Sequence, residues 1–311
     1  MKKVAFVFPG QGSQYVGMGK EIYENFSSAR HIFDAAEPAC GLPIKDLCFN
    51  GPEDKLVQTE ITQPAIFTVS VAIAKVLLEK GIEPSFLAGH SLGEYAAFCL
   101  SGALKFEDGV ALVRKRGAFM QEAVPQGQGA MAAVLNLDRK AVLDACKQAA
   151  DLGIVQPANF NSPGQIVISG KKEAVEKASQ LCKEKGAKRV IPLAVSAPFH
   201  CALMQPAADK LKIELDKISF GSMDIPVVPN ILAQPLFDAA KIKDVLFSQV
   251  TGSVLWEDSI REMIQQGVEI FCEAGPKKVL SGLIAKIDPT VKVFSVEDLA
   301  SLELFLQEVK N

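Results

Sequence analysis

The feature that most constrains this chain is the segment Gly89-His90-Ser91-Leu92-Gly93-Glu94, which contains the pattern G-x-S-x-G. The apolar residues 86–88 before it predict a buried strand, and residues 92–100 after it predict a helix with one apolar face. Strand, sharp turn and helix are the context of a nucleophile elbow, whose glycines allow a turn that a Cβ would obstruct. Ser91 is therefore a candidate nucleophile at a helix start. There, free N–H groups and the helix dipole would stabilise an oxyanion.

Composition limits the function classes that remain. The chain has 311 residues, which suits one large domain with an insertion, or two domains. A net charge of −3 gives no basic footprint for nucleic acid. No apolar run approaches the length of a membrane span, and the apolar start is too short for a secretion signal. The seven cysteines lack metal-ligand spacing, which indicates reduced thiols, no metal and a cytoplasm-like compartment.

A glycine-rich loop at residues 9–14 follows the first predicted strand, residues 4–8. A dinucleotide-binding fingerprint would need a third small residue three positions after Gly12, and Tyr15 stands there. The loop therefore does not indicate a nicotinamide site.

The predicted elements divide the chain into two parts. Within residues 127–195, strands at 130–135, 154–160, 165–169 and 189–193 and helices at 138–150 and 171–185 follow the order β-α-β-β-α-β, with a turn at 161–164. This order predicts a ferredoxin-like subdomain inserted into a larger α/β catalytic domain, residues 1–126 and 196–311. Elements of that domain are expected at 62–80, 106–124, 204–218, 269–272 and 291–296.

A serine nucleophile needs a base, and the chain has only three histidines. His31 lies in a polar helical stretch and is expected at the surface. His90 precedes Ser91 directly, and neighbouring side chains on a turn diverge. His200 lies in a loop between a predicted strand and a predicted helix, where α/β folds carry catalysis. We favour His200, with His90 as the alternative. No acidic residue between 91 and 200 stands at a convincing strand end to orient the imidazole, so a backbone carbonyl or an amide remains open.

Arg116 falls beside the apolar stripe of the predicted helix 106–124, whereas Lys115 points to the opposite side. A guanidinium in apolar surroundings needs an anion. The sequence leaves two interpretations open: an internal salt bridge or snorkelling side chain, and a fork that binds a substrate carboxylate.

With these residues assembled, the chain resembles the malonyl-CoA:acyl carrier protein transacylases, the acyltransferases of fatty acid and polyketide synthesis, from end to end. The matching motifs are residues 8–14, 62–65, 89–94, 116–117 with 120–121, 159–165, the loop around His200, and 275–276. The resemblance implies an α/β fold: a hydrolase-like core with a mostly parallel sheet and an inserted ferredoxin-like subdomain.

The resemblance also implies roles for individual residues. Ser91 would be the nucleophile, His200 the base, and Arg116 the holder of the malonyl carboxylate. Backbone N–H groups of Gln11 and Leu92 would form the oxyanion hole. The resemblance further assigns Gln249 to orient the histidine through its main-chain carbonyl, and it assigns substrate contacts to Met120, Phe199 and Asn161. Phe199 stands where many stand-alone bacterial members have a small residue, and its ring would favour malonyl over methylmalonyl.

The resemblance implies malonyl-CoA and phosphopantetheinylated acyl carrier protein as substrates, with no bound cofactor. A serine esterase or thioesterase with the same elbow is the alternative, and a non-catalytic binding module is a third hypothesis. Arg116 separates the first two, because a neutral ester hydrolase has no use for a cation there. The location is expected to be cytoplasmic, or an organelle stroma or matrix. Because carrier proteins are acidic, docking is expected on a local basic cluster: Lys183, Lys185, Lys188 and Arg189, or Lys277, Lys278 and Lys286.

Overall fold

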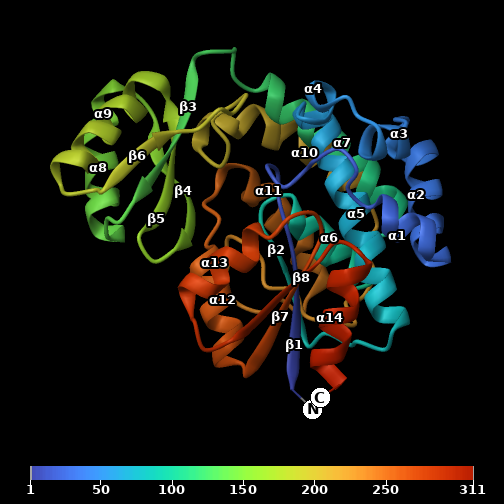
Figure 1. Ribbon diagram of the computed structural model, residues 1–311. Helices are drawn as coiled ribbons and strands as arrows, with labels where there is room; N and C mark the ends of the chain where they lie inside the picture. Colours follow the sequence, from blue (N-terminus) through green and yellow to red (C-terminus); the bar gives the residue numbers. More distant parts are fainter. Residues whose placement is uncertain (1, 311) are drawn as a thin grey trace.

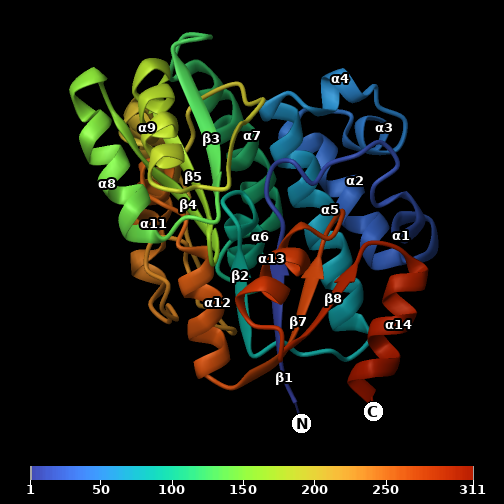
Figure 2. The same ribbon diagram turned by 60° about the vertical axis from the view of Figure 1, so that its left-hand side comes forward.

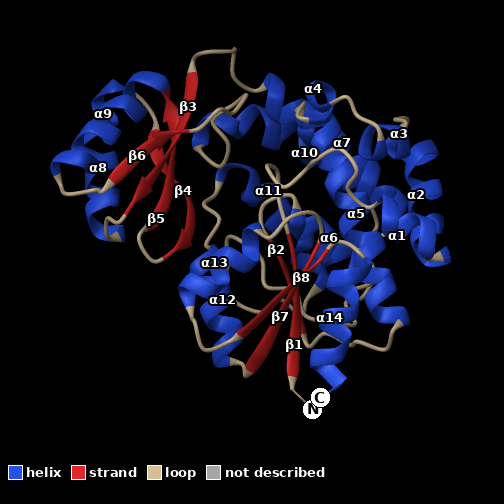
Figure 3. Ribbon diagram, in the orientation of Figure 1, coloured by secondary structure: helices blue, strands red, loops and turns tan. Residues whose placement is uncertain are grey.

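The computed structural model describes residues 2–310, and its larger part is built on a parallel sheet of four strands (Figures 1 and 3). The strands are β1 (Lys3–Phe8), β2 (Phe86–Gly89), β7 (Val268–Ala274) and β8 (Lys292–Val296). Their order in the sheet is β2-β1-β7-β8, and every neighbouring pair is parallel. This agrees with the expected α/β fold and mostly parallel sheet.

Both faces of this sheet are buried, as parallel sheets require. Along β1, Phe6 and Phe8 join one hydrophobic cluster, whereas Ala5 and Val7 join another on the opposite face. The first cluster includes residues of α5 (Thr59–Glu79), α6 (Gly93–Leu100), α7 (Phe106–Glu122) and α14 (Leu299–Lys310). The second is covered by α12 (Trp256–Gln265) and α13 (Val279–Ile287), which lie across the sheet from them (Figure 2). The carboxyl ends of β1 and β2 therefore meet at one edge of a rigid core.

Helix α5 is apolar and long enough, by length and composition, to cross a membrane. However, 83% of its most apolar window is buried inside the protein. Its burial on nearly all sides reflects its place at the centre of the larger hydrophobic cluster, packed against α6 and α7.

The remaining helices of the larger part lie around this core. They are α1 (Lys20–Asn25), α2 (Ser27–Cys40), α3 (Ile44–Phe49), α4 (Glu53–Leu56), α10 (Gln205–Lys217) and α11 (Ile242–Thr251), with short 3₁₀ turns at Ala202–Met204 and Ala239–Lys241. The sequence analysis predicted none of α1, α3, α4 and α11 to α14, and the first three are too short to show a helical period.

A second, antiparallel sheet lies apart from the first, at the upper left of Figure 1. Its elements are β3 (Gly129–Leu135), α8 (Arg139–Ala149) with a 3₁₀ turn at Ala150–Leu152, β4 (Val155–Ser162), β5 (Gln165–Lys171), α9 (Lys172–Glu184) and β6 (Arg189–Pro192). The sheet order β4-β5-β3-β6 places the first and third strands of the unit in the middle. The order of elements is the one expected, while the division into domains at residues 127 and 195 stays a prediction.

One expected turn is shorter than predicted. The sequence suggested a turn over residues 161–164, but β4 continues to Ser162, which pairs with Gln165. A two-residue connection at Pro163 and Gly164 closes the hairpin, and Gly164 takes the left-handed conformation with φ 69°. Asn161 therefore lies on a strand, which fixes its side chain relative to its neighbours.

Candidate active site

The elbow between β2 and α6 is packed too tightly for any side chain at its glycines. A Cβ on Gly89 would lie 1.9 Å from the carbonyl carbon of Gly93, and one on Gly93 would lie 2.0 Å from the backbone oxygen of Phe8. Between them Ser91 has φ 51°, a left-handed conformation that a non-glycine residue adopts only where its surroundings hold it. The turn therefore projects Ser91 at the carboxyl edge of the parallel sheet.

Ser91 is paired with His200, 109 residues away in the chain. The Oγ of Ser91 lies 2.7 Å from Nε2 of His200. The other ring nitrogen, Nδ1, lies 2.9 Å from the backbone oxygen of Gln249. A carbonyl can only accept, so Nδ1 carries the proton and Nε2 is left to accept from the serine. No carboxylate of the described residues hydrogen-bonds to this imidazole, and a backbone carbonyl orients it instead.

Burial keeps His200 neutral. Only 3% of this residue is exposed. Desolvation, followed by the positive charge of Arg116, lowers the pKa of His200 to about 3. The ring is therefore in its basic form at neutral pH.

The other two histidines have different environments. The Nε2 of His90 lies 2.9 Å from Oδ1 of Asn161, and its ring meets Trp256 edge-on at 5.6 Å between centroids. Burial lowers the pKa of His90. His31 is exposed on α2, as expected. His90 is thus held against β4 by Asn161, while the partner of the serine is His200.

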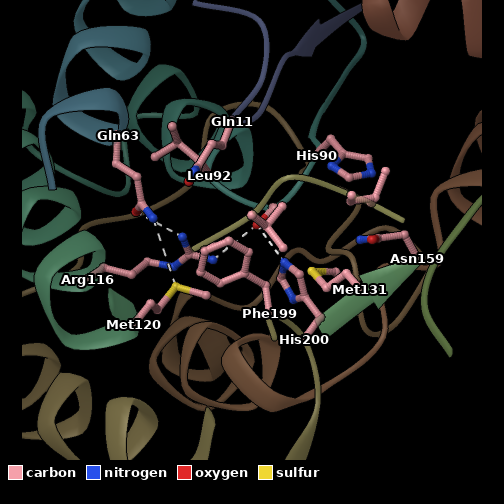
Figure 4. Close-up of a pocket in the computed structure, with 13 residues that line it drawn as sticks. Gln11, Gln63, His90, Leu92, Arg116, Met120, Met131, Asn159, Phe199 and His200 are labelled. Carbon is pink, nitrogen blue, oxygen red and sulfur yellow. Dashed lines mark hydrogen bonds between the residues drawn. The ribbon is translucent and has the colours of Figure 1, made fainter. Parts of the chain in front are cut away.

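Arg116 is buried beside the serine on α7, with 1% of its surface exposed. Its Nη2 donates to Ser91 Oγ at 3.2 Å and to Gln249 Oε1 at 3.0 Å. Its Nη1 donates to Gln63 Oε1 at 2.9 Å (Figure 4). Across residues 2–310, no carboxylate oxygen lies within 4.0 Å of it. The sequence left two interpretations of Arg116 open. This environment disagrees with the first of them, an internal salt bridge or a snorkelling side chain.

These groups line one cavity of about 150 Å³. Its lining comprises Gln11, Gln63, His90, Ser91, Leu92, Arg116, Met120, Met131, Asn159, Leu193, Val195, Phe199 and His200. Figure 4 shows Gln63 and Arg116 on one side and His90 and Asn159 on the other. Of the residues assigned from the resemblance, only Asn161 and Gln249 do not line this cavity, and both act on histidines that do.

The backbone N–H groups of Gln11 and Leu92 have no acceptor among the described residues. Leu92 stands at the N-cap of α6, where the helix leaves its first N–H groups unpaired. Both residues border the cavity. Two unpaired donors next to the serine are the arrangement that a developing oxyanion requires.

Sequence reasoning missed Asn230, whose side chain ties the elbow together. Its Oδ1 accepts the N–H of Ser91 at 2.7 Å, and its Nδ2 donates to the backbone oxygen of Gly89 at 2.6 Å. The backbone N–H of Asn230 in turn donates to Oε2 of Glu94 at 2.6 Å, and burial raises the pKa of this carboxyl to about 8. A lone asparagine after Val227, Val228 and Pro229 carries no motif that could have identified it.

Comparison with known proteins places the chain. The family described as "Acyl transferase domain" matches residues 5–302. The chain is 49% identical to the malonyl CoA-acyl carrier protein transacylase of Bacillus subtilis strain 168, over 100% of this chain and 98% of that protein. It is 46% identical to the protein of the same name from Escherichia coli strain K12, over 99% of this chain and 100% of that protein.

Solved structures agree with this. The acyl carrier protein S-malonyltransferase of Vibrio cholerae superimposes with a TM-score of 0.96 at 47% identity, over 97% of this chain and 99% of that one. A malonyl-transacylase in complex with its type II PKS acyl-carrier protein superimposes with a TM-score of 0.95 at 46% identity, over 98% of this chain and 99% of that one. The match in sequence and in structure covers both the catalytic edge of the parallel sheet and the antiparallel sheet. The chain belongs to the acyl transferase domain family.

Proposed function

We propose that this enzyme transfers the malonyl group of malonyl-CoA to the phosphopantetheine thiol of acyl carrier protein, through a malonyl ester of Ser91, and so supplies fatty acid biosynthesis. The observation that carries the proposal is the buried Arg116, which has no carboxylate partner and lies 3.2 Å from the serine oxygen. An acyl group with a terminal carboxylate would supply the missing anion. The activities for which these relatives are named support the same substrates.

The first half-reaction forms the acyl-enzyme. Nε2 of His200 accepts the Ser91 proton as Oγ attacks the thioester carbonyl. The resulting oxyanion accepts hydrogen bonds from the backbone N–H groups of Gln11 and Leu92. When the tetrahedral intermediate collapses, the C–S bond breaks and His200 returns the proton to the departing coenzyme A thiol.

The second half-reaction reverses these roles. His200 takes the proton of the phosphopantetheine thiol, and the sulfur attacks the ester carbonyl of malonyl-Ser91. The C–O bond to the serine breaks, and the proton on His200 passes to Oγ. Because the nucleophile of this step is a thiol, the cavity must favour the carrier arm over water.

Substrate selection rests on the residues around the acyl group. The Arg116 guanidinium presents a planar fork that suits a carboxylate. Met120 and Phe199 line the same cavity, and the Phe199 ring would crowd an α-methyl group, which favours malonyl over methylmalonyl. A serine esterase with the same elbow is not favoured, because a neutral ester offers nothing to compensate the buried cation.

The seven cysteines are all buried and free, which fits a reducing, cytoplasmic location. The two half-reactions need only the two thioester partners and the side chains named above. We therefore propose coenzyme A thioester and acyl carrier protein as the sole reactants.

Intact mass spectrometry tests the proposal. After mixing with malonyl-CoA, the enzyme should gain the mass of one malonyl group, and holo acyl carrier protein should remove it. An esterase would instead hydrolyse malonyl-CoA without carrier protein. Absence of the malonyl adduct, or its loss to water as fast as to carrier protein, would refute the transfer.

A further inference from the structure

The buried guanidinium of Arg116 is held entirely by neutral acceptors. Two of the three are amide oxygens, Gln63 Oε1 at 2.9 Å and Gln249 Oε1 at 3.0 Å, and the third is the hydroxyl of Ser91. The face of Tyr95 lies 5.3 Å from the guanidinium carbon, and Arg116 Nε has no hydrogen-bond partner among the described residues. Glu94 and Tyr95 also act on this charge, but burial raises the pKa of the Glu94 carboxyl to about 8, and no carboxylate of the described residues forms an ion pair with Arg116. The positive charge is therefore positioned but not paired with a carboxylate.

A buried arginine is more often paired with a carboxylate, because an uncompensated charge is costly to remove from water. At position 63 a glutamate would have nearly the same shape as the glutamine and would supply that carboxylate. The protein instead has an amide, which offers a hydrogen bond without a negative charge. An anion that enters the cavity would offset the cost of this buried cation.

Gln63 differs from Gln249 in what else it does. Gln249 also orients His200 through its backbone oxygen and donates from Nε2 to the backbone oxygen of Ser91 at 2.9 Å. Gln63 lies on α5 with 2% of its surface exposed, and among the described residues its side chain hydrogen-bonds only with Arg116 and, at 3.9 Å, with the sulfur of Met120. Gln63 makes no hydrogen bond to Ser91 or His200 among the described residues, so a change at Gln63 acts on the serine–histidine pair only through Arg116.

We propose that Gln63 is a specificity-determining residue, whose neutral amide aims the Arg116 fork into the cavity and leaves its positive charge free for the carboxylate of the acyl donor. This inference rests on the proposed function, because it concerns how the same site selects a carboxylated acyl group. An internal carboxylate at this position would compete with the substrate for Arg116.

The test compares transfer from malonyl-CoA and from acetyl-CoA in two variants. In Gln63→Glu, the new carboxylate occupies the fork, so kcat/KM for malonyl should fall by roughly 30-fold or more while acetyl transfer falls far less. In Gln63→Met, the fork loses one acceptor but keeps its charge. The KM of the Gln63→Met variant for malonyl-CoA should rise by about fivefold to tenfold, whereas its kcat for acetyl transfer should change little.

Gln58→Glu is the matched control. Gln58 is exposed at the start of the same helix, so this substitution adds the same negative charge in solvent. It should leave both donors unaffected. Equal losses on malonyl and acetyl in Gln63→Glu would mean that Gln63 is merely structural. If that variant does not fold, an unchanged malonyl-to-acetyl ratio in Gln63→Met would overturn the inference by itself.

These outcomes are distinct from failure of the proposed function. If the unaltered enzyme forms no malonyl adduct, the substrate assignment is wrong. If it forms the adduct and Gln63→Glu keeps the full preference for malonyl, only the role of Gln63 is wrong.

Discussion

At the scale of single residues, the site depends on an imidazole that is kept neutral by its surroundings. The pKa of His200 is lowered to about 3 by burial and by Arg116, so its unprotonated form is present above that value and is lost only as pH falls through it. The rate of acylation by malonyl-CoA should therefore be nearly flat between about pH 5 and pH 7, although an unperturbed histidine titrates near pH 6.5. Single-turnover acylation across this range checks the prediction. A loss of rate with a midpoint near 6.5 would contradict it.

Removing either member of the serine–histidine pair should separate their roles. Ser91→Ala should abolish the malonyl adduct and leave the fold intact, because it removes only a hydroxyl. His200→Ala should slow acylation by a factor on the order of 10² or more, since the general base is lost. Quenched-flow acylation measures both, and His31→Ala at the exposed histidine is the control. A larger chemical defect in His90→Ala than in His200→Ala would reverse the choice of base.

Arg116 should control the choice of acyl group rather than the chemistry. Arg116→Ala removes the cation, so malonyl transfer should lose roughly 2–5 kcal/mol of transition-state stabilisation, whereas acetyl transfer loses much less. Arg116→Lys should not restore malonyl transfer, because an ammonium lacks the planar fork. The measurement is kcat/KM for both donors. Losses of the same size on the two donors would show that the residue serves only the fold.

At the scale of elements, the elbow closes on itself and packs against β1 only because Gly89 and Gly93 lack a side chain. Gly93→Ala would place a Cβ 2.0 Å from the backbone oxygen of Phe8, which must force β1 and α6 apart. We expect a loss of about 1–3 kcal/mol in the free energy of unfolding, together with a large loss of acylation. Gly282→Ala is the matched control, because this glycine lies on the exposed face of α13, and a methyl group added to it would have no atom within 4 Å.

The control variant Gly282→Ala should be slightly more stable than the parent enzyme. Alanine replaces glycine in a helix interior with a gain of about 0.5–1 kcal/mol. Urea denaturation of both variants gives the comparison. A Gly93→Ala enzyme as stable and as active as the parent would show that the elbow relaxes at little cost.

At the scale of the whole molecule, the acidic carrier protein must approach a slightly acidic enzyme, so docking should depend on a local basic cluster. In one cluster, Lys188 and Arg189 are exposed at the start of β6. In the other, Lys277 and Lys278 are exposed, and Lys277 Nζ donates to the backbone oxygen of Gly12 at 3.3 Å, next to the loop of Gln11.

If one of these two clusters is the docking surface, charge reversal of its pair should raise the KM for carrier protein without slowing acylation by malonyl-CoA. Transfer should also weaken as salt rises, because exposed charges are screened over about 8–10 Å at physiological ionic strength. Measuring the two half-reactions separately for each double variant tests this. Transfer that resists both reversals and added salt would exclude electrostatic docking.

The sequence by itself determined the features of this protein that depend on local residue patterns. Short apolar runs predicted the core strands of the parallel sheet, the order of the predicted strands and helices indicated the β-α-β-β-α-β unit, and the spacing of two glycines around Ser91 predicted the elbow. Arg116 stood out because a charge lay beside an apolar stripe within one helix. Each of these patterns lies within a short segment of the chain, so the sequence alone is sufficient to recognise it.

Only the tertiary structure decided which groups meet. Gln63 reaches Arg116 across 53 residues, and Asn230 reaches Gly89 across 141. It also decided that Arg116 is held by amides rather than by a carboxylate, and that Asn161 serves His90 instead of lining the cavity. A buried polar side chain takes its role from partners that the fold brings within hydrogen-bond distance, and no periodicity in the sequence records that distance.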